Sequence, residues 1–162
     1  MKLRKLILTA LFISLSFIGA NIKIVGSIAF DSMPGFLGAL ILGPVYGAII
    51  GALGHFLTAL TSGFYMSLPV HIIIMIGMAI TMYAFGWFYK ILKSKSLVAI
   101  SISSLIAVLI NGPITILMII PIMGKGILAM LPILSLVAFL NVLIAHICYK
   151  ILPRDMKESR GI

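Results

Sequence analysis

The sequence predicts an all-α integral membrane protein: a single bundle of six transmembrane helices with both termini in the cytoplasm. Hydrophobic residues make up 62% of the 162 residues and charged residues only 9%, whereas a soluble domain carries roughly 25% charged residues. The length suits five or six spans of about 20 residues each. Because no room remains for a separate soluble domain, residues 1–162 are expected to form one multi-pass domain in the cell membrane.

Apolar segments and their breaks place the helices at residues 5–24, 31–42, 44–62, 69–92, 97–120 and 128–152. The first segment resembles a signal peptide, but Ile18 stands where a cleavage site needs a small residue, so we expect a retained helix. Gly43-Pro44 separates the second helix from the third, and Asn111-Gly112-Pro113 is expected to break the fifth in its middle.

The second helix is the shortest, and the distribution of basic residues indicates whether it crosses the membrane. Asp31 or Ser32 can cap it and Pro34 suits its first turn, but twelve residues rise only about 18 Å against a hydrocarbon core of ~30 Å. Six spans with a cytoplasmic N-terminus leave only Lys23 and Lys125 of the 12 basic residues outside. Without that crossing, eight of the 12 would lie outside. The positive-inside rule therefore favours six spans.

Several functions are disfavoured by what the sequence lacks. The net charge of +9 does not indicate nucleic-acid binding, because the basic residues lie at helix ends, as the positive-inside rule requires. No phosphate-binding G-x-x-x-x-G-K-[ST] motif is present, and Cys148 is the single cysteine. With Asp31 as the one carboxylate in the six segments, we expect no enzyme, no metal site and no cofactor. Uphill transport would need energy from a partner protein.

The stretch from Ser27 to Gly63 carries the strongest signs of a specific site. It contains Asp31 and His55 among many glycines. The spacing of Gly43, Gly47 and Gly51 is typical of close helix packing, and the same glycines could instead let the backbone approach a ligand.

Other polar residues predict the rest of an outward-facing pocket. Asp31 could be an interfacial charge paired with Lys23, and His55 a hydrogen-bonded packing residue, but ionisable residues within a membrane favour a function. Asn111 lies at a helix break, and broken helices line cavities, although its amide could merely satisfy that break. We expect the substrate-binding residues to be Asn21, Lys23, Asp31, Ser32, His55, Tyr65, His71 and Asn111.

Short motifs give the chain a family resemblance. The run Leu42–Gly51, LGPVYGAIIG, is similar to the LGP-x-x-G-x-x-x-G passage of the substrate-binding S components of energy-coupling factor (ECF) vitamin transporters. Asp31–Leu37, Gly51–His55 and Leu68–His71 look most like the S components assigned to α-ribazole, a precursor of the cobamide lower ligand. The resemblance covers nearly the whole chain in its topology, although the motif itself is short.

This resemblance implies a function and a set of partners. An S component captures a vitamin or precursor from outside and docks on a transmembrane coupling subunit that carries two ATPase subunits, where it is thought to topple and release its cargo. The family docks through Ala-x-x-x-Ala on the first helix, which here is Ala10-x-x-x-Ser14, with serine keeping the surface small. An S component for another vitamin, an oligomeric scaffold or channel in contact with membrane lipid, and a membrane enzyme remain as alternatives.

Overall fold

The chain forms a bundle of helices with a short β-hairpin inserted after the first helix. The computed structural model describes residues 2–25, 28–92 and 97–153. In chain order, its elements are α1 (Lys2–Ala20), β1 (Lys23–Val25), β2 (Ile28–Ala29), α2 (Met33–Ile41), α3 (Pro44–Thr61), α4 (Leu68–Ile91), α5 (Leu97–Leu109), the π-helical turn η1 (Ile110–Ile114), α6 (Thr115–Met123), the 3₁₀ helix η2 (Lys125–Met130) and α7 (Leu131–Ile151).

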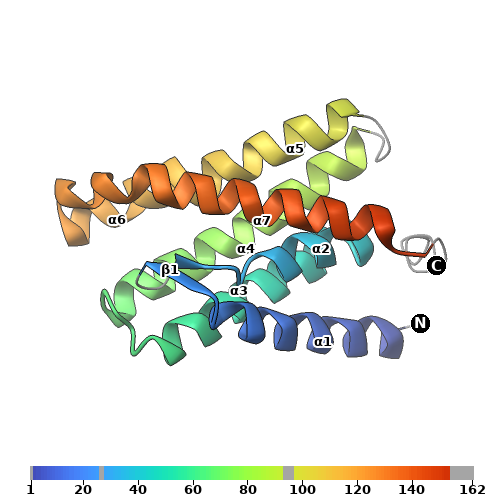
Figure 1. Ribbon diagram of the computed structural model, residues 1–162, viewed down its shortest axis with the longest axis horizontal. Helices are drawn as coiled ribbons and strands as arrows, with labels where there is room; N and C mark the ends of the chain where they lie inside the picture. Colours follow the sequence, from blue (N-terminus) through green and yellow to red (C-terminus); the bar gives the residue numbers. More distant parts are fainter. Residues whose placement is uncertain (1, 26–27, 93–96, 154–162) are drawn as a thin grey trace.

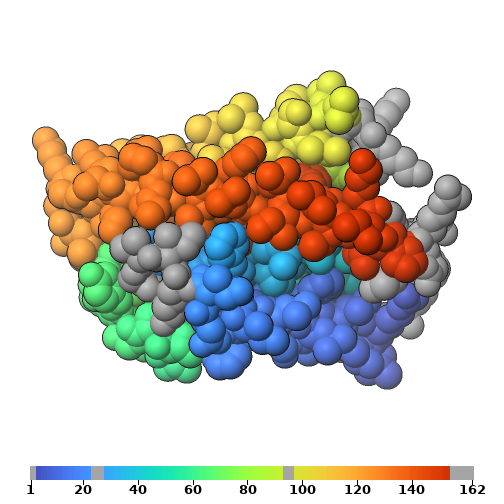
Figure 2. All heavy atoms as spheres, in the orientation of Figure 1, coloured from blue at the N-terminus to red at the C-terminus, as the bar shows by residue number. Residues whose placement is uncertain are grey.

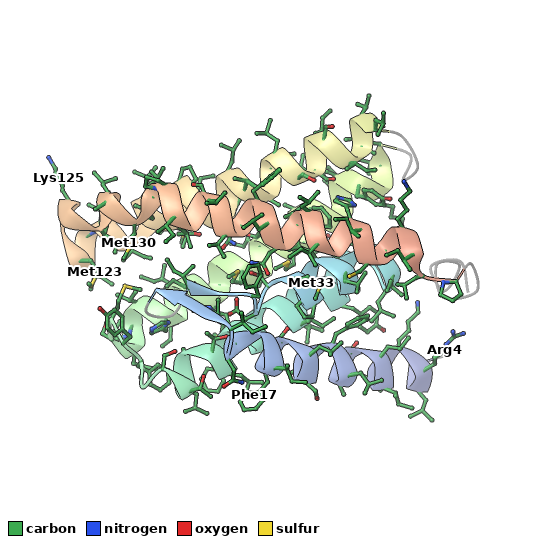
Figure 3. All side chains as sticks on the ribbon, in the orientation of Figure 1. Arg4, Phe17, Met33, Met123, Lys125 and Met130 are labelled. Carbon is green, nitrogen blue, oxygen red and sulfur yellow. The ribbon has the colours of Figure 1, made fainter. Side chains whose placement is uncertain are left out.

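Five apolar helical stretches of the described chain are long enough to cross a membrane. Three are the single helices α1, α3 and α4; the fourth runs from Leu97 to Met123 through η1, and the fifth from Lys125 to Ile151 through η2 and α7. The start of α1 and the end of α7 lie at the same end of the bundle (Figure 1). Arg4 lies at this end and Lys125 at the opposite end (Figure 3). The chain is therefore a multi-pass helical bundle.

The helix expected over residues 5–24 ends early, at Ala20. The Asn21 side chain donates a hydrogen bond to the carbonyl of Phe17 at 2.8 Å, and the backbone turns through a bond from Ile22 N–H to the carbonyl of Gly19 at 3.0 Å. A Cβ at Gly19 would overlap the carbonyl oxygen of Phe30. The missing side chain therefore lets the returning hairpin pack against the end of α1.

The second helix, expected over residues 31–42, is the nine-residue helix α2, and a short β-hairpin precedes it where the end of the first helix and a connection were expected. β1 pairs antiparallel with β2, and the chain returns toward the termini through β2 and then α2 (Figure 1). Residues 34–41 of α2 are all buried, and α2 packs against α1, α3, α4 and α7. A helix that is apolar on every side belongs in such a position, so α2 forms the centre of the bundle.

The start of α2 is held by a residue from the other end of the sequence. Ser32 occupies the N-cap position without a side-chain capping bond, contrary to expectation. Instead, Oδ1 of Asn141 on α7 accepts the N–H of Met33 at 2.8 Å, and its Nδ2 donates to the carbonyls of Val137 at 2.9 Å and Ala29 at 3.4 Å. Non-helical backbone at membrane depth needs such partners inside the protein. Figure 2 shows the segment after α1 lying against α7 along this face.

The expected break at Asn111-Gly112-Pro113 is a widened helical turn rather than an interruption. Residues Ile110–Ile114 form a π-helical turn between α5 and α6. Pro113 cannot donate a backbone hydrogen bond, and the hydroxyl of Thr115 donates to the carbonyl of Ile110 at 2.7 Å. The helix therefore continues across the membrane, while the extra residue of the turn alters which side chains face the bundle. Such turns are frequent at functional sites.

The core and the glycines of α3 hold α2 in place. Phe36 of α2 meets Phe85 of α4 edge-to-face, with ring centroids 5.0 Å apart. A Cβ at Gly47 would lie 2.5 Å from the Cβ of Ala39 on α2, and one at Gly51 would lie 2.6 Å from Cγ of Met82 on α4. Both glycines therefore serve helix packing.

Gly43 departs from the packing role expected for the glycine stripe. A Cβ there would contact nothing within 4 Å, whereas its φ of +104° is one that other residues rarely adopt. Gly43 therefore permits the turn between α2 and α3.

Candidate functional site

A cavity of about 80 Å³ lies inside the bundle. Its walls come from the hairpin, the two residues just before α2, the loop after α3, and the helical elements α3, α4, η1, α6, η2 and α7. Met130 of η2 is one of the lining residues, and Figure 3 shows Met130 with Lys125 at the end of the bundle opposite Arg4. The cavity therefore lies in the half of the molecule remote from the termini.

Asp31 supplies the negative charge of this cavity. Its side chain is 3% exposed and follows the hairpin, just before α2. The Thr58 hydroxyl donates to Oδ2 at 2.6 Å, and the Ser32 hydroxyl donates to Oδ1 at 3.4 Å. Nδ1 of His55 lies 3.4 Å from Oδ2, close enough for charge attraction but outside hydrogen-bond geometry. A buried carboxylate needs such partners, and α3 supplies two of them.

Two histidines extend this arrangement from α3 to α4. Nε2 of His55 lies 3.1 Å from Nδ1 of His71. With the Asp31 carboxylate ionised and His55 neutral, the tautomer of His55 that carries its proton on Nδ1 directs that proton toward Oδ2 of Asp31. Nε2 of His55 is then the acceptor, and Nδ1 of His71 the donor. This assignment leaves Nε2 of His71 as an acceptor, and that atom is buried without a hydrogen-bond partner.

Asn111, in the π-helical turn, also lines the cavity. Asn111 is 3% exposed, and its amide makes no hydrogen bond within the described part of the chain. The remaining lining side chains are mainly apolar and include Met78, Ile116, Ile119, Met130, Leu134 and Val137. An apolar cavity with a few polar groups is the usual form of a small-molecule site.

The structure brings together most of the residues that the sequence predicts for the site. Asp31, Ser32, His55, Tyr65 and Asn111 line the cavity, and His71 lies behind His55 as its hydrogen-bond partner.

The two remaining predicted residues are Asn21 and Lys23. Asn21 is exposed, caps α1 and is not among the residues that line the cavity. The side chain of Lys23 lies outside the described residues, and its pairing with Asp31 stays a prediction.

The sequence reasoning missed Thr58 and the apolar wall. Thr58 follows His55 by three residues, a spacing that puts both side chains on one face of a helix, so this signal was present. The apolar lining residues resemble any lipid-facing or core residue of a membrane helix, and no local pattern distinguishes them. Within the described residues, no cluster of three or more histidine, cysteine or carboxylate side chains could hold a metal ion.

The residues expected to dock a partner lie on a separate surface. Ala10 and Ser14 are both exposed on α1, and the Ser14 hydroxyl donates to the carbonyl of Ala10 at 3.0 Å. That bond satisfies the hydroxyl within the helix and leaves a small, nearly apolar surface. Large exposed apolar residues surround this surface, among them Leu3, Leu6, Ile7, Leu11 and Ile18.

Comparisons with known proteins identify the family to which the chain belongs. A search of curated proteins and a search of solved structures each found no match. The model of the family described as "ECF transporter, substrate-specific component" matches residues 4–153, nearly the whole chain. Proteins of this family bind small-molecule substrates and work with the ECF transmembrane and ATPase subunits. The chain therefore belongs to the ECF transporter substrate-specific component family.

Proposed function

We propose that this protein captures a small vitamin or vitamin precursor in the cavity beside Asp31 and delivers it to a coupling subunit with two ATPase subunits. The observation that carries the proposal is that one apolar cavity is lined by a buried carboxylate, Asp31, and by Asn111, whose buried amide makes no hydrogen bond with the described residues. The cavity binds and releases its ligand without chemical change, so the protein acts as a transport subunit and not as an enzyme.

Charge supports an orientation in which the cavity faces outward. Arg4 and Lys5 begin α1, Lys90 is in the last turn of α4 and Lys150 in the last turn of α7. These residues mark the end that holds both termini, and Lys125 marks the other end (Figures 1 and 3). By the positive-inside rule the terminal end lies in the cytoplasm. In the cell membrane, the cavity then receives its ligand from outside.

We infer that α-ribazole is the ligand. Support comes from the sequence resemblance of Asp31–Leu37, Gly51–His55 and Leu68–His71, because Asp31, His55 and His71 form one connected group. The apolar walls suit a heteroaromatic ring, and the polar groups suit hydroxyl or ring-nitrogen partners. In a thermal-shift screen of vitamins and precursors, α-ribazole at 100 times its Kd should stabilise the protein by about 2.7 kcal/mol. Stabilisation by a different vitamin alone would reject this ligand and retain the transport role.

Ligand entry requires movement of a wall. Drug-sized ligands occupy pockets of roughly 300–1,000 Å³, well above the present volume of about 80 Å³. The loop after α3 supplies Tyr65 and Met66 to the cavity, and Tyr65 is largely exposed. Phe64 and Ser67 in this loop have φ values of 51° and 135°, which are strained for residues other than glycine. This loop is therefore the wall that we expect to open.

The exposed face of α1 should dock the coupling subunit. Replacing Ala10 and Ser14 together with leucine should abolish co-purification with the coupling and ATPase subunits, because close helix approach needs small residues. Ligand binding should persist, since neither residue lines the cavity. Ser101→Leu is the matched control, a small-to-large change on the exposed side of α5. A complex that survives the double substitution would rule out docking through this face.

A further inference from the structure

We propose that the cavity selects ligands by charge: it accepts neutral or cationic molecules that present an N–H or O–H to Oδ1 of Asp31, and it rejects carboxylates and phosphates. This inference rests on the proposed function and names the substrate class of the same site. The evidence is the hydrogen-bonding capacity that Asp31 and Asn111 leave unused, together with the formal charges of the residues that line the cavity.

The two carboxylate oxygens of Asp31 differ in the hydrogen-bond donors that the protein supplies to them. Oδ2 accepts the Thr58 hydroxyl at 2.6 Å and also faces Nδ1 of His55 at 3.4 Å. Among the described side chains, Oδ1 is contacted only by Ser32, at 3.4 Å, which is long for an O–H···O hydrogen bond. A carboxylate oxygen can accept two hydrogen bonds. Oδ1 therefore keeps room for a strong donor, and a ligand that enters the cavity can supply it.

While they are neutral, His55 and His71 add no positive charge beside Asp31. The proton of His55 points toward Asp31 in the tautomer described above, and Nε2 of His55 is occupied by His71 at 3.1 Å. His55 therefore offers no further N–H to an anionic ligand. The chain of Asp31, His55 and His71 presents acceptors at both ends, on Oδ1 of Asp31 and on Nε2 of His71.

Asn111 can pair with either a donor or an acceptor, but it adds no positive charge to the cavity. The Asn111 amide can donate through its NH₂ group and accept through its oxygen, so it can pair with a second polar atom of the ligand. Asp31 is the one residue with a formal charge among the described residues that line the cavity; lysine and arginine are absent from that lining. A carboxylate or phosphate would be taken from water and placed beside Asp31 with no cation among the described lining residues to compensate, which is strongly unfavourable.

Three related probes distinguish the effect of a hydrogen-bond donor on the ligand from the effect of a negative charge on the ligand. Benzimidazole carries an N–H on an apolar ring, 1-methylbenzimidazole lacks that N–H, and benzimidazole-5-carboxylate adds a negative charge. Binding to the full chain in detergent micelles would be measured at neutral pH by ligand-observed NMR, with competition between probes. We expect benzimidazole to bind at least tenfold more tightly than the methylated probe and the carboxylate to show no competition. Equal binding of all three, tighter binding of the carboxylate, or no binding of benzimidazole would overturn the inference.

The Asp31→Asn variant tests whether the carboxylate of Asp31 causes the selectivity between the probes. An amide in place of the carboxylate should bring the binding of benzimidazole and 1-methylbenzimidazole within about threefold of each other and allow the carboxylate probe to compete. If the variant does not fold, the wild-type ratios still decide the inference. Co-purification of the wild-type chain with the coupling subunit tests the proposed function separately, because it requires none of the probes. A chain that docks but binds the carboxylate probe best would therefore refute the selectivity alone.

Discussion

Replacing Asp31 with alanine should weaken binding of the proposed ligand, α-ribazole, by roughly 100-fold. The substitution removes an acceptor for the ligand, and hydrogen bonds to charged groups contribute about 1.5–3 kcal/mol, which corresponds to roughly a 10- to 100-fold change in Kd. It also leaves the hydroxyl of Thr58 without the carboxylate that it contacts at 2.6 Å and frees His55 to rotate. Isothermal titration calorimetry on the purified full-length protein measures this loss directly.

A matched pair of histidine substitutions provides the control. His55→Gln changes a residue that lines the cavity and should lower the affinity about tenfold by disturbing Asp31. His146→Gln changes a partly buried histidine of α7 that contacts Ser104 at 3.3 Å and lies outside the cavity lining, and it should leave the affinity within about twofold of wild type. If Asp31→Ala and His55→Gln both bind the ligand as wild type does, the binding site lies elsewhere.

Replacing Gly47 with valine should largely prevent folding. A Cβ at Gly47 would lie 2.5 Å from the Cβ of Ala39 and 2.8 Å from its Cα, so relief requires α2 and α3 to separate. Overpacking in a well-packed core costs typically 1–3 kcal/mol, and a clash with a backbone atom of a fully buried helix belongs at or above the top of that range. We expect low yield and early thermal unfolding in detergent, followed by fluorescence-detected size-exclusion chromatography.

Ala48→Val tests whether this effect depends on the interface. Ala48 is the neighbouring residue on α3 and is partly exposed, so the same side chain added there should change the melting temperature little. A Gly47→Val protein that melts together with wild type would mean that α2 and α3 do not pack at the distance seen here.

Much of the architecture follows from the sequence, because apolar length and charge placement directly reflect the demands of a membrane. α3 and α4 occupy the residues 44–61 and 68–91, within one residue of the expected ranges at each end. The hairpin and the shortened α2 do not follow. Ile22, Ile24 and Val25 suit a helix or a strand equally, and short apolar runs do not distinguish the two. The deciding interactions come from Asn141, more than 100 residues away in the sequence.

The polar residues of the candidate site can also be predicted from the sequence. Polar residues are rare in membrane segments, so Asp31, His55 and Asn111 stand out individually. Their convergence depends on α2 being buried at the centre of the bundle, and the choice of apolar partners depends on which face of each helix turns inward. The π-helical turn at Ile110–Ile114 changes that face within one helix, and no periodic pattern could have indicated it. Sequence therefore predicts the polar atoms of the site better than its shape.

The proposed mechanism rests on one central claim: a single chain holds one small molecule in the cavity beside Asp31. Native mass spectrometry of the full-length protein, released from micelles after incubation with a panel of vitamins and precursors, tests this claim most directly. We expect a monomer that carries one bound small molecule, with the bound fraction saturating with concentration and lost in Asp31→Ala. A ligand-free homo-oligomer that conducts ions after reconstitution into vesicles would contradict the claim and would identify the glycine-rich helices as a self-association surface instead.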